Sequence, residues 1–169
     1  MDISKFISKI IPPADYQHRN GFDNVPLLNE LSNSEKQEIE YVLLEKLKLE
    51  SPTSLDCLIA ETLAYLKSKK SIPIMKDFLN YDIDEPAKLI IYRCIFEISG
   101  DPEMVEPAIS LFKKMDNKAD SYYIYKLIAG FYELAKFGNA KANQAILEYV
   151  NHLESLLSYN ARRALGIQK

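Results

Sequence analysis

Apolar residues recur at helical spacing along most of this chain, and short polar corners interrupt them. The clearest case is "IYRCIFEISGDPEMVEPAISLF", residues 91–112. Positions 90, 91, 94, 95 and 98 are apolar, which places them on one face of a helix. Gly100 suits the C-terminal cap of that helix, Asp101 the N-cap of the next helix, and Pro102 its first position. We therefore predict two helices that pack against each other across this corner.

The same corner raises the question of phosphate binding. A phosphate-binding loop needs several glycines after a strand, usually with a lysine. The stretch "SGDPE" has one glycine beside two carboxylates, which would repel an anion. The corner is predicted to be a bend.

The helix–corner–helix pattern occurs three times, in units that begin at residues 59, 91 and 127. These starts are 32 (91 − 59) and 36 (127 − 91) residues apart, within the range of repeats built from helix pairs. One pair is too small to bury its own apolar face, so neighbouring pairs must stack to form a core. We predict an all-α, right-handed α-solenoid of about four helix pairs over residues 34–169. Residues 1–33 are predicted to form an N-terminal arm of helix and loop.

Capping residues predict where individual helices begin and end. Ser34, with Gln37 three positions later, predicts a capping box at the start of a helix over 34–49. Lys67, Lys69 and Lys70 are placed to interact with carbonyl groups at the end of the second helix. The helices predicted to line the concave face are 53–67, 86–99, 120–136 and 158–166.

The stretch "YRCIFEISGDPEMVEPAISLF", together with "ARRALG" at 161–166, resembles the HEAT-repeat pattern. The resemblance extends over residues 34–169, although the unit at 59 lacks Gly-Asp-Pro and the unit at 127 has "FGNAKA" instead. HEAT-like proteins are mostly scaffolds and binding modules, and a minority are enzymes, including bilin-lyase-type proteins and DNA glycosylases that remove alkylated bases. Small bacterial members of this size are similar to immunity proteins that neutralise toxins. This analogy carries the functional expectation.

Charge and composition narrow the classes of partner. The chain has 21 basic and 24 acidic residues, a net charge of −3, so no strong field attracts it to nucleic acid or anionic lipid. No apolar run approaches the ~18 residues of a membrane span, and the apolar stretch at the N-terminus is too short for a signal peptide. Cys57 and Cys94 lie among apolar neighbours without metal-ligand spacing. We expect a cytoplasmic protein with no cofactor or metal, and with both cysteines in the core.

Eleven tyrosines and no tryptophan point to tyrosine as the main aromatic contact residue. Tyrosine and arginine are common in the energetic centres of interfaces, although tyrosines also pack between neighbouring repeats. In "SYYIYK", Tyr122, Tyr123 and Tyr125 point in three directions around a helix, so at least one should be accessible. The predicted partner-binding residues on the concave face are Glu61, Tyr65, Tyr92, Arg93, Glu97, Tyr125, Lys126, Tyr132, Glu133, Tyr159 and Arg162, with Arg163 beside them.

The arm segment "PPADYQHRNGFDNVP", residues 12–26, reads as a loop because of its prolines, glycine and Asn/Asp residues. Tyr16 and Phe22 are predicted to pin it across the first helix pair. His18, Asp15 and Asp23 are an acid and base set, but no nucleophile or oxyanion-binding group accompanies them. Catalysis is therefore not expected.

These observations favour a non-catalytic protein-binding module, in its sharper form one that neutralises a bacterial toxin. Two alternatives remain. A HEAT-like glycosylase acting on DNA would need a basic, aromatic groove with a carboxylate that faces the flipped base. The candidates for that groove are Arg93, Lys126, Arg162 and Arg163 with Tyr92 and Tyr125, but Glu61, Glu97 and Glu133 in the same region oppose it. The other alternative is a stand-alone scaffold or adaptor.

Overall fold

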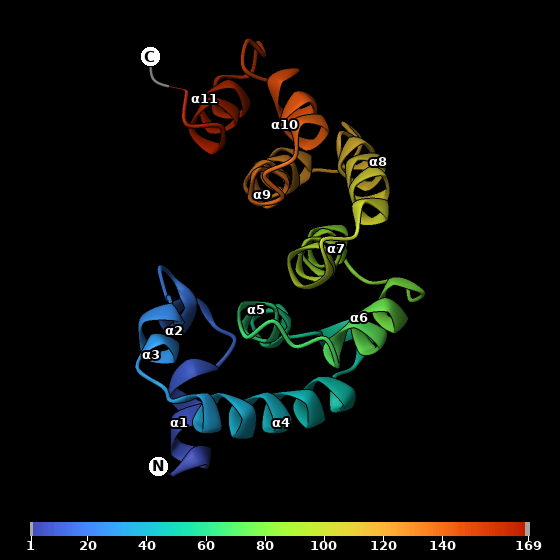
Figure 1. Ribbon diagram of the computed structural model, residues 1–169. Helices are drawn as coiled ribbons and strands as arrows, with labels where there is room; N and C mark the ends of the chain where they lie inside the picture. Colours follow the sequence, from blue (N-terminus) through green and yellow to red (C-terminus); the bar gives the residue numbers. More distant parts are fainter. Residues whose placement is uncertain (1, 168–169) are drawn as a thin grey trace.

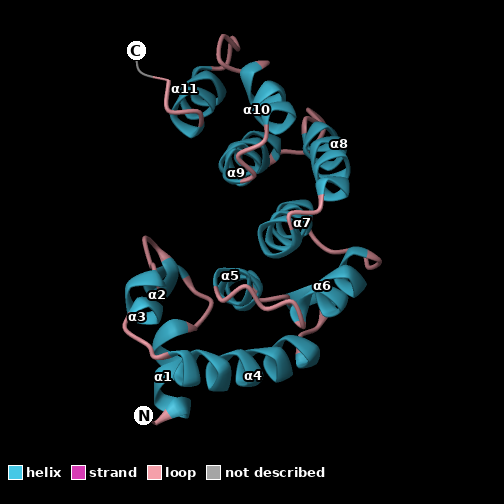
Figure 2. Ribbon diagram, in the orientation of Figure 1, coloured by secondary structure: helices cyan, strands magenta, loops and turns pink. Residues whose placement is uncertain are grey.

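The computed structural model describes residues 2–167, and every regular element in that range is a helix (Figure 1, Figure 2). The all-α prediction is confirmed. The α-helices are α1 (Ile3–Ile10), α2 (Tyr16–Arg19), α3 (Val25–Asn29), α4 (Asn33–Leu49), α5 (Cys57–Tyr65), α6 (Ser71–Leu79), α7 (Glu85–Ser99), α8 (Val105–Met115), α9 (Tyr123–Lys136), α10 (Ala140–Leu147) and α11 (Ser155–Ala164). Two short 3₁₀ helices, η1 (Pro52–Ser54) and η2 (Pro102–Met104), precede α5 and α8.

The helices form a curved arrangement with two layers (Figure 1). Helices α5, α7, α9 and α11 follow the inside of the curve, and each packs against the next in this series. We call these four the inner layer. Helices α4, α6, α8 and α10 lie on the outside. None of the helices described in residues 2–167 combines the length and apolar composition that a membrane span requires.

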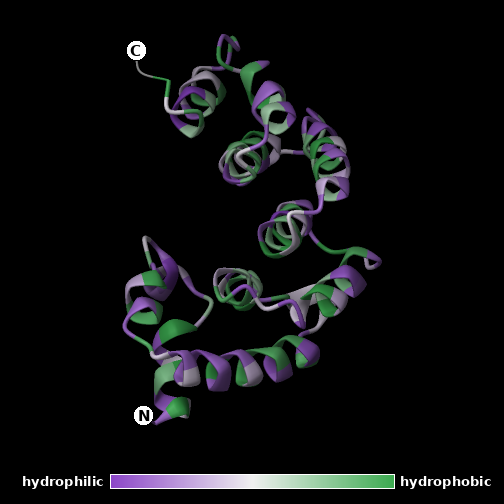
Figure 3. Ribbon diagram, in the orientation of Figure 1, coloured by the Kyte–Doolittle hydropathy of each residue, from purple (hydrophilic) through white to green (hydrophobic). Residues whose placement is uncertain are grey.

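Helix α7 is central to the apolar core, which consists of two clusters of buried side chains. Cys94 and Ile95 belong to the first cluster, which extends from α1 to α7. Leu89 belongs to the second cluster, which extends to α11, and Phe96 packs against it. The two core clusters therefore lie on opposite sides of α7. The outer helix α4 also has one apolar face, and in Figure 3 green and purple segments alternate along it.

The Gly-Asp-Pro corner is a bend between α7 and α8, as predicted. Gly100 ends α7 in the left-handed conformation with φ 68°, where a side chain would be strained. The Asp101 side chain accepts a hydrogen bond from the backbone N–H of Glu103, and Pro102 begins η2. Hydrogen bonds within the chain therefore cap both sides of the corner.

The N-cap residue of helix α4 lies two positions earlier than predicted. The cap is Ser32, with Glu35 as its partner, whereas Ser34 and Gln37 lie inside the helix. The Ser32 hydroxyl accepts from the Glu35 N–H, and the Glu35 carboxylate accepts from the Ser32 N–H at 3.0 Å. The Ser32 hydroxyl also donates to the Glu35 carboxylate at 2.7 Å, and this hydrogen bond, together with the one from the Ser32 N–H, lowers the pKa of Glu35. The sequence "SNSEKQ" contains both Ser-x-x-Glu and Ser-x-x-Gln, and a charged acceptor makes the stronger box.

Replacing Ser32 with alanine should lower the free energy of unfolding by about 1 kcal/mol, because the cap of α4 loses its side-chain acceptor. Urea denaturation followed by circular dichroism measures this change. Ser34→Ala is the matched control and should change stability by less than about 0.5 kcal/mol. Equal losses in the two variants would contradict the observed capping.

The inner-layer helices differ from their predicted bounds mainly at their ends. Helix α5 begins at Cys57 because Asp56 caps it, while the residues before it form η1. It ends at Tyr65, and Lys67 has a positive φ of 56°. The Lys67 ammonium group donates to the Glu97 carbonyl oxygen at 2.9 Å, so its predicted role at the end of its own helix is wrong.

The arm is more helical than predicted and is held by different residues. Tyr16 is 79% exposed, so it does not pin the arm, and it lies in α2 rather than in a loop. Arg19 instead pairs with Asp56 at 2.7 Å. The buried Asn24 side chain donates to the Thr62 hydroxyl at 2.8 Å and to a carbonyl oxygen of α1 at 3.1 Å. Asn24 lies in a segment of turn-forming residues, and the sequence gives no sign of this buried role.

Candidate functional site

Arg93 is the centre of an ion-pair network within the inner layer. Its side chain is only 7% exposed, because α5 and α9 pack on either side of α7. Each guanidinium nitrogen donates to a different carboxylate. Nη2 contacts Glu61, Nη1 contacts Glu97 at 3.0 Å, and Nε contacts Glu133 at 2.9 Å.

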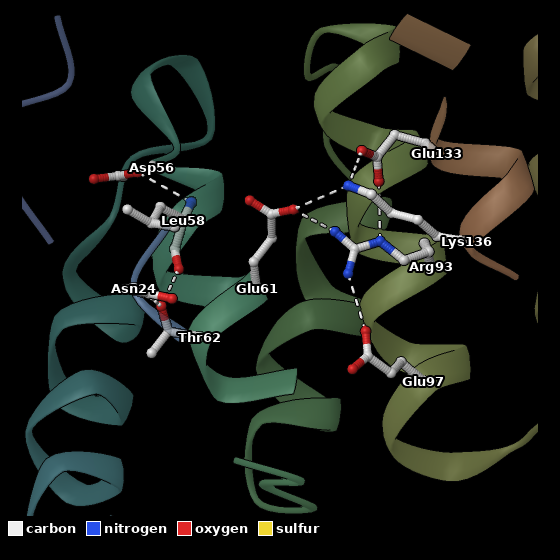
Figure 4. A network of polar contacts seen from close by, with 9 residues as sticks. All are labelled: Asn24, Asp56, Leu58, Glu61, Thr62, Arg93, Glu97, Glu133 and Lys136. Carbon is white, nitrogen blue, oxygen red and sulfur yellow. Dashed lines mark hydrogen bonds and ion pairs between the residues drawn. The ribbon is translucent and has the colours of Figure 1, made fainter. Parts of the chain in front are cut away.

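Lys136 adds a second cation to this network (Figure 4). Its ammonium group lies 2.6 Å from Glu133 Oε1 and 3.8 Å from Glu61 Oε1. The network thus joins one helix turn in each of α5, α7 and α9. Burial by itself would lower the pKa of Arg93, but the nearby carboxylates of Glu133 and Glu61 outweigh it and raise that pKa above its ordinary value. Arg93 therefore stays charged.

The prediction that Arg93 and Glu133 are exposed on the concave face is wrong. Both residues are buried. A charged residue between apolar positions of a helix is typical of a solvated face, but here opposite charges on two neighbouring helices compensate for its burial. Glu61 and Glu97, whose side chains are 31% and 35% exposed, lie at the accessible edge of the network.

A pocket of about 390 Å³ lies over this network, between the arm and the inner layer. We call it the inner pocket. The arm contributes Phe22, Asp23, Asn24 and Val25, α5 contributes Leu58, Glu61 and Tyr65, α7 contributes Arg93 and Glu97, and α9 contributes Lys136. The arm folds back onto α5 through Arg19 and Asn24, and this contact creates the pocket.

Several other predicted contact residues hold neighbouring helices together. Tyr65 donates from its hydroxyl to Asn29 in α3, and Tyr132 donates to Asn160 in α11 at 3.0 Å. Tyr92 is half-buried against the second core cluster. These three tyrosines therefore pack between neighbouring helices, which was the alternative to a role in partner binding.

Two of the predicted basic contacts are also engaged internally. Lys126 lies 2.6 Å from Glu85 and 2.8 Å from Asp120, and these hydrogen bonds raise its pKa, with Asp120 the larger contributor. Arg162 donates from Nε to the Val150 carbonyl oxygen at 2.8 Å.

The exposed members of the predicted set are Glu97, Tyr125 and Tyr159, and Arg163 beside the set is exposed as well. Tyr125 is 68% exposed and Tyr159 is 52% exposed. In "SYYIYK", Tyr122 is exposed as well and Tyr123 is half-buried, so the prediction that one of them is accessible is confirmed.

The candidate catalytic groups named from the sequence do not converge on the inner pocket. Burial, with Glu61 and Asp56 nearby, raises the pKa of Cys57 to about 12, so its thiol is protonated at neutral pH and is a poor nucleophile. His18 lies 2.8 Å from Asp15 on the exposed surface of the arm, while Asp23 lines the pocket, so the predicted acid and base set is divided. Within residues 2–167, no group of three or more His, Cys, Asp or Glu side chains is positioned to hold a metal ion.

Lys136 and Asn24 were missed as site residues. Lys136 follows Glu133 by three positions, a spacing that indicates a helix ion pair and would have linked it to the charged set. Asn24 gave no such signal, because its partners lie 14 and 38 residues away.

Comparisons of this chain with protein-family models, with curated proteins and with solved structures found no match. The functional proposal therefore rests on the chemistry of the inner layer and its pocket.

Proposed function

We propose that this chain is a non-catalytic protein-binding module whose inner layer is the binding surface. The observation that carries this proposal is a stripe of mostly exposed side chains on α9. Tyr125, Ala129, Tyr132 and Lys136 are spaced by four, three and four residues, so they share one face of that helix. Tyr125, Ala129 and Lys136 are exposed, and Lys136 also lines the inner pocket.

The two-layer arrangement supports an α-solenoid of HEAT-like helix pairs as the architecture of this module. In such folds each unit contacts mainly its neighbours, and the curvature creates an extended concave surface. The series α5, α7, α9 and α11 follows this rule, since each inner helix packs on the next. A partner bound along the inside would contact several helices at once.

A polypeptide partner fits this surface better than DNA does. A glycosylase groove needs basic residues that are free to contact phosphates. Arg93 is enclosed by three carboxylates, Lys126 by two, and Arg162 bonds to a backbone carbonyl oxygen. Of the four candidate cations, only Arg163 is exposed. Exposed tyrosines with mixed charges are instead the composition of a protein interface.

Within this class, the sharper proposal is a cytoplasmic protein that neutralises a bacterial toxin. It follows from the resemblance of residues 92–112 to the HEAT-repeat pattern, which small bacterial immunity proteins share, and the accessible acidic edge formed by Glu61 and Glu97 is compatible with it. A basic active site would meet complementary charge there. The partner should then be an enzyme that the chain inhibits at a one-to-one ratio.

Site-specific photo-crosslinking tests the proposal. With p-benzoylphenylalanine in place of Tyr125 or Ala129, irradiation in the native lysate should give one discrete crosslinked protein, identified by mass spectrometry. The matched control places the same amino acid at Tyr41, an exposed tyrosine of α4 in the outer layer, where no such product is expected. Equal crosslinking from Tyr41, or crosslinks to DNA, would contradict the proposal.

A further inference from the structure

The inner pocket has an aromatic and apolar wall beside a charged floor. Phe22 and Tyr65 line it with Leu58 and Val25, and all four side chains are half-buried. Tyr65 is fixed by its hydrogen bond to Asn29. The volume of about 390 Å³ is enough for a long side chain to enter with its stem against these rings.

Two carboxylates that line the pocket, those of Glu61 and Asp23, keep free acceptor atoms. Figure 4 shows that both contacts of Glu61, to Arg93 and Lys136, use the same oxygen. Among the interactions of residues 2–167, the second Glu61 oxygen has no donor. Asp23 accepts only the Val25 N–H, through Oδ1, and forms no ion pair within that range.

Both cations of the pocket are already paired with carboxylates, so the charge that remains unpaired is negative. All three Arg93 nitrogens donate to carboxylates, and Lys136 is held by Glu133. The lining carries three carboxylates (Asp23, Glu61, Glu97) and two cations (Arg93, Lys136). Glu133 and Lys67, which pair with lining residues from outside the pocket, cancel each other. One negative charge remains uncompensated.

From these contacts we infer that the inner pocket receives an arginine or lysine side chain of the partner polypeptide. This inference rests on the proposed function and specifies the chemistry of its partner. The cation meets the free oxygens of Glu61 and Asp23, and its aliphatic stem packs on Phe22 and Tyr65, where an aromatic face also attracts positive charge. A polypeptide bound along the α9 stripe reaches the pocket at Lys136.

The test is a titration of the full chain, at low salt, with the peptide acetyl-Gly-Arg-Gly-amide, followed by ¹H–¹⁵N NMR. Shifts should be confined to residues 22–25 and to α5, α7 and the end of α9. The citrulline peptide has the same shape without the charge and should bind at least about tenfold more weakly, and the glutamate peptide should not bind.

Two conservative variants test which carboxylates of the pocket bind the positive charge of the peptide. Asp23→Asn keeps the acceptor for Val25, and Glu61→Gln keeps the hydrogen bond to Arg93, so both should fold. Each should weaken arginine-peptide binding about fivefold. Glu38→Gln, an exposed carboxylate of α4, is the control and should leave binding unchanged. The same spectra report whether each variant is folded.

Equal binding of the arginine and citrulline peptides, or shifts elsewhere on the surface, would overturn the pocket assignment. The titration needs no natural partner, so its outcome is independent of the photo-crosslinking result. Arginine preference without a crosslinked partner contradicts the binding module alone. A crosslinked partner without arginine preference contradicts the pocket assignment alone.

Discussion

Replacing Arg93 with methionine should lower the free energy of unfolding by about 3 to 5 kcal/mol, as expected when one partner of a buried ion pair is removed. The methionine fills similar space but leaves Glu133, whose side chain is 12% exposed, with only Lys136 as a cation. It also removes the contact that joins α5 and α9 through α7. Urea denaturation followed by circular dichroism measures the loss.

Two further variants separate this effect from a general loss of charge. Lys113→Met removes a half-exposed partner of Glu148 and should cost less than about 0.5 kcal/mol. Adding Glu133→Gln to Arg93→Met removes the buried charge that lacks its arginine, and the double variant should be more stable than the single one. A loss below about 1 kcal/mol in Arg93→Met would show that the network contributes little to stability.

Phe112→Ala should be at least as costly, by about 3 to 5 kcal/mol, because it empties the centre of the second core cluster. Phe112 is fully buried in α8, with ring centroids 5.6 Å from Phe131 and 5.7 Å from Tyr149. Gly130 of α9 faces the same ring. A Cβ atom added at Gly130 would lie 2.6 Å from Phe112 Cδ2, so Gly130→Ala alone should cost about 1 to 3 kcal/mol through overpacking.

Combining the two substitutions tests the contact, because the effect of Gly130→Ala on stability should change sign when Phe112 is absent. Once Phe112 is alanine, the ring that opposes a side chain at position 130 is gone. Gly130→Ala should then stabilise the protein by up to about 1 kcal/mol, the helix preference of alanine over glycine. A double-mutant cycle in urea measures the coupling, and the same sign in both backgrounds would refute the proposed contact.

The helices and their corners were largely predictable because their determinants are local. The apolar spacing in α7, the left-handed Gly100 and the Asp101 cap all depend on residues within a few positions. Where two local solutions overlap, as with Ser32 and Ser34, the pattern alone did not decide between them.

The candidate site was predicted only in part because its determinants are distant in sequence. Arg93 has partners 32 and 40 residues away, so its own helix gives no sign that it is buried. Glu61, Glu97 and Glu133 recur at intervals of 36 residues (97 − 61 and 133 − 97), but this interval alone does not show that all three converge on one arginine. The pocket depends on the return of the arm to α5, which no periodic pattern encodes.

The double role of α7 determines how this chain can be divided. Ile95 and Cys94 complete the core on one side of the helix, and Leu89 and Phe96 contribute to the other. A fragment that ends before α7 lacks one wall of the first core, and a fragment that begins after it lacks one wall of the second. Both fragments need their own copy of this helix, so a split version of the protein requires α7 on each piece.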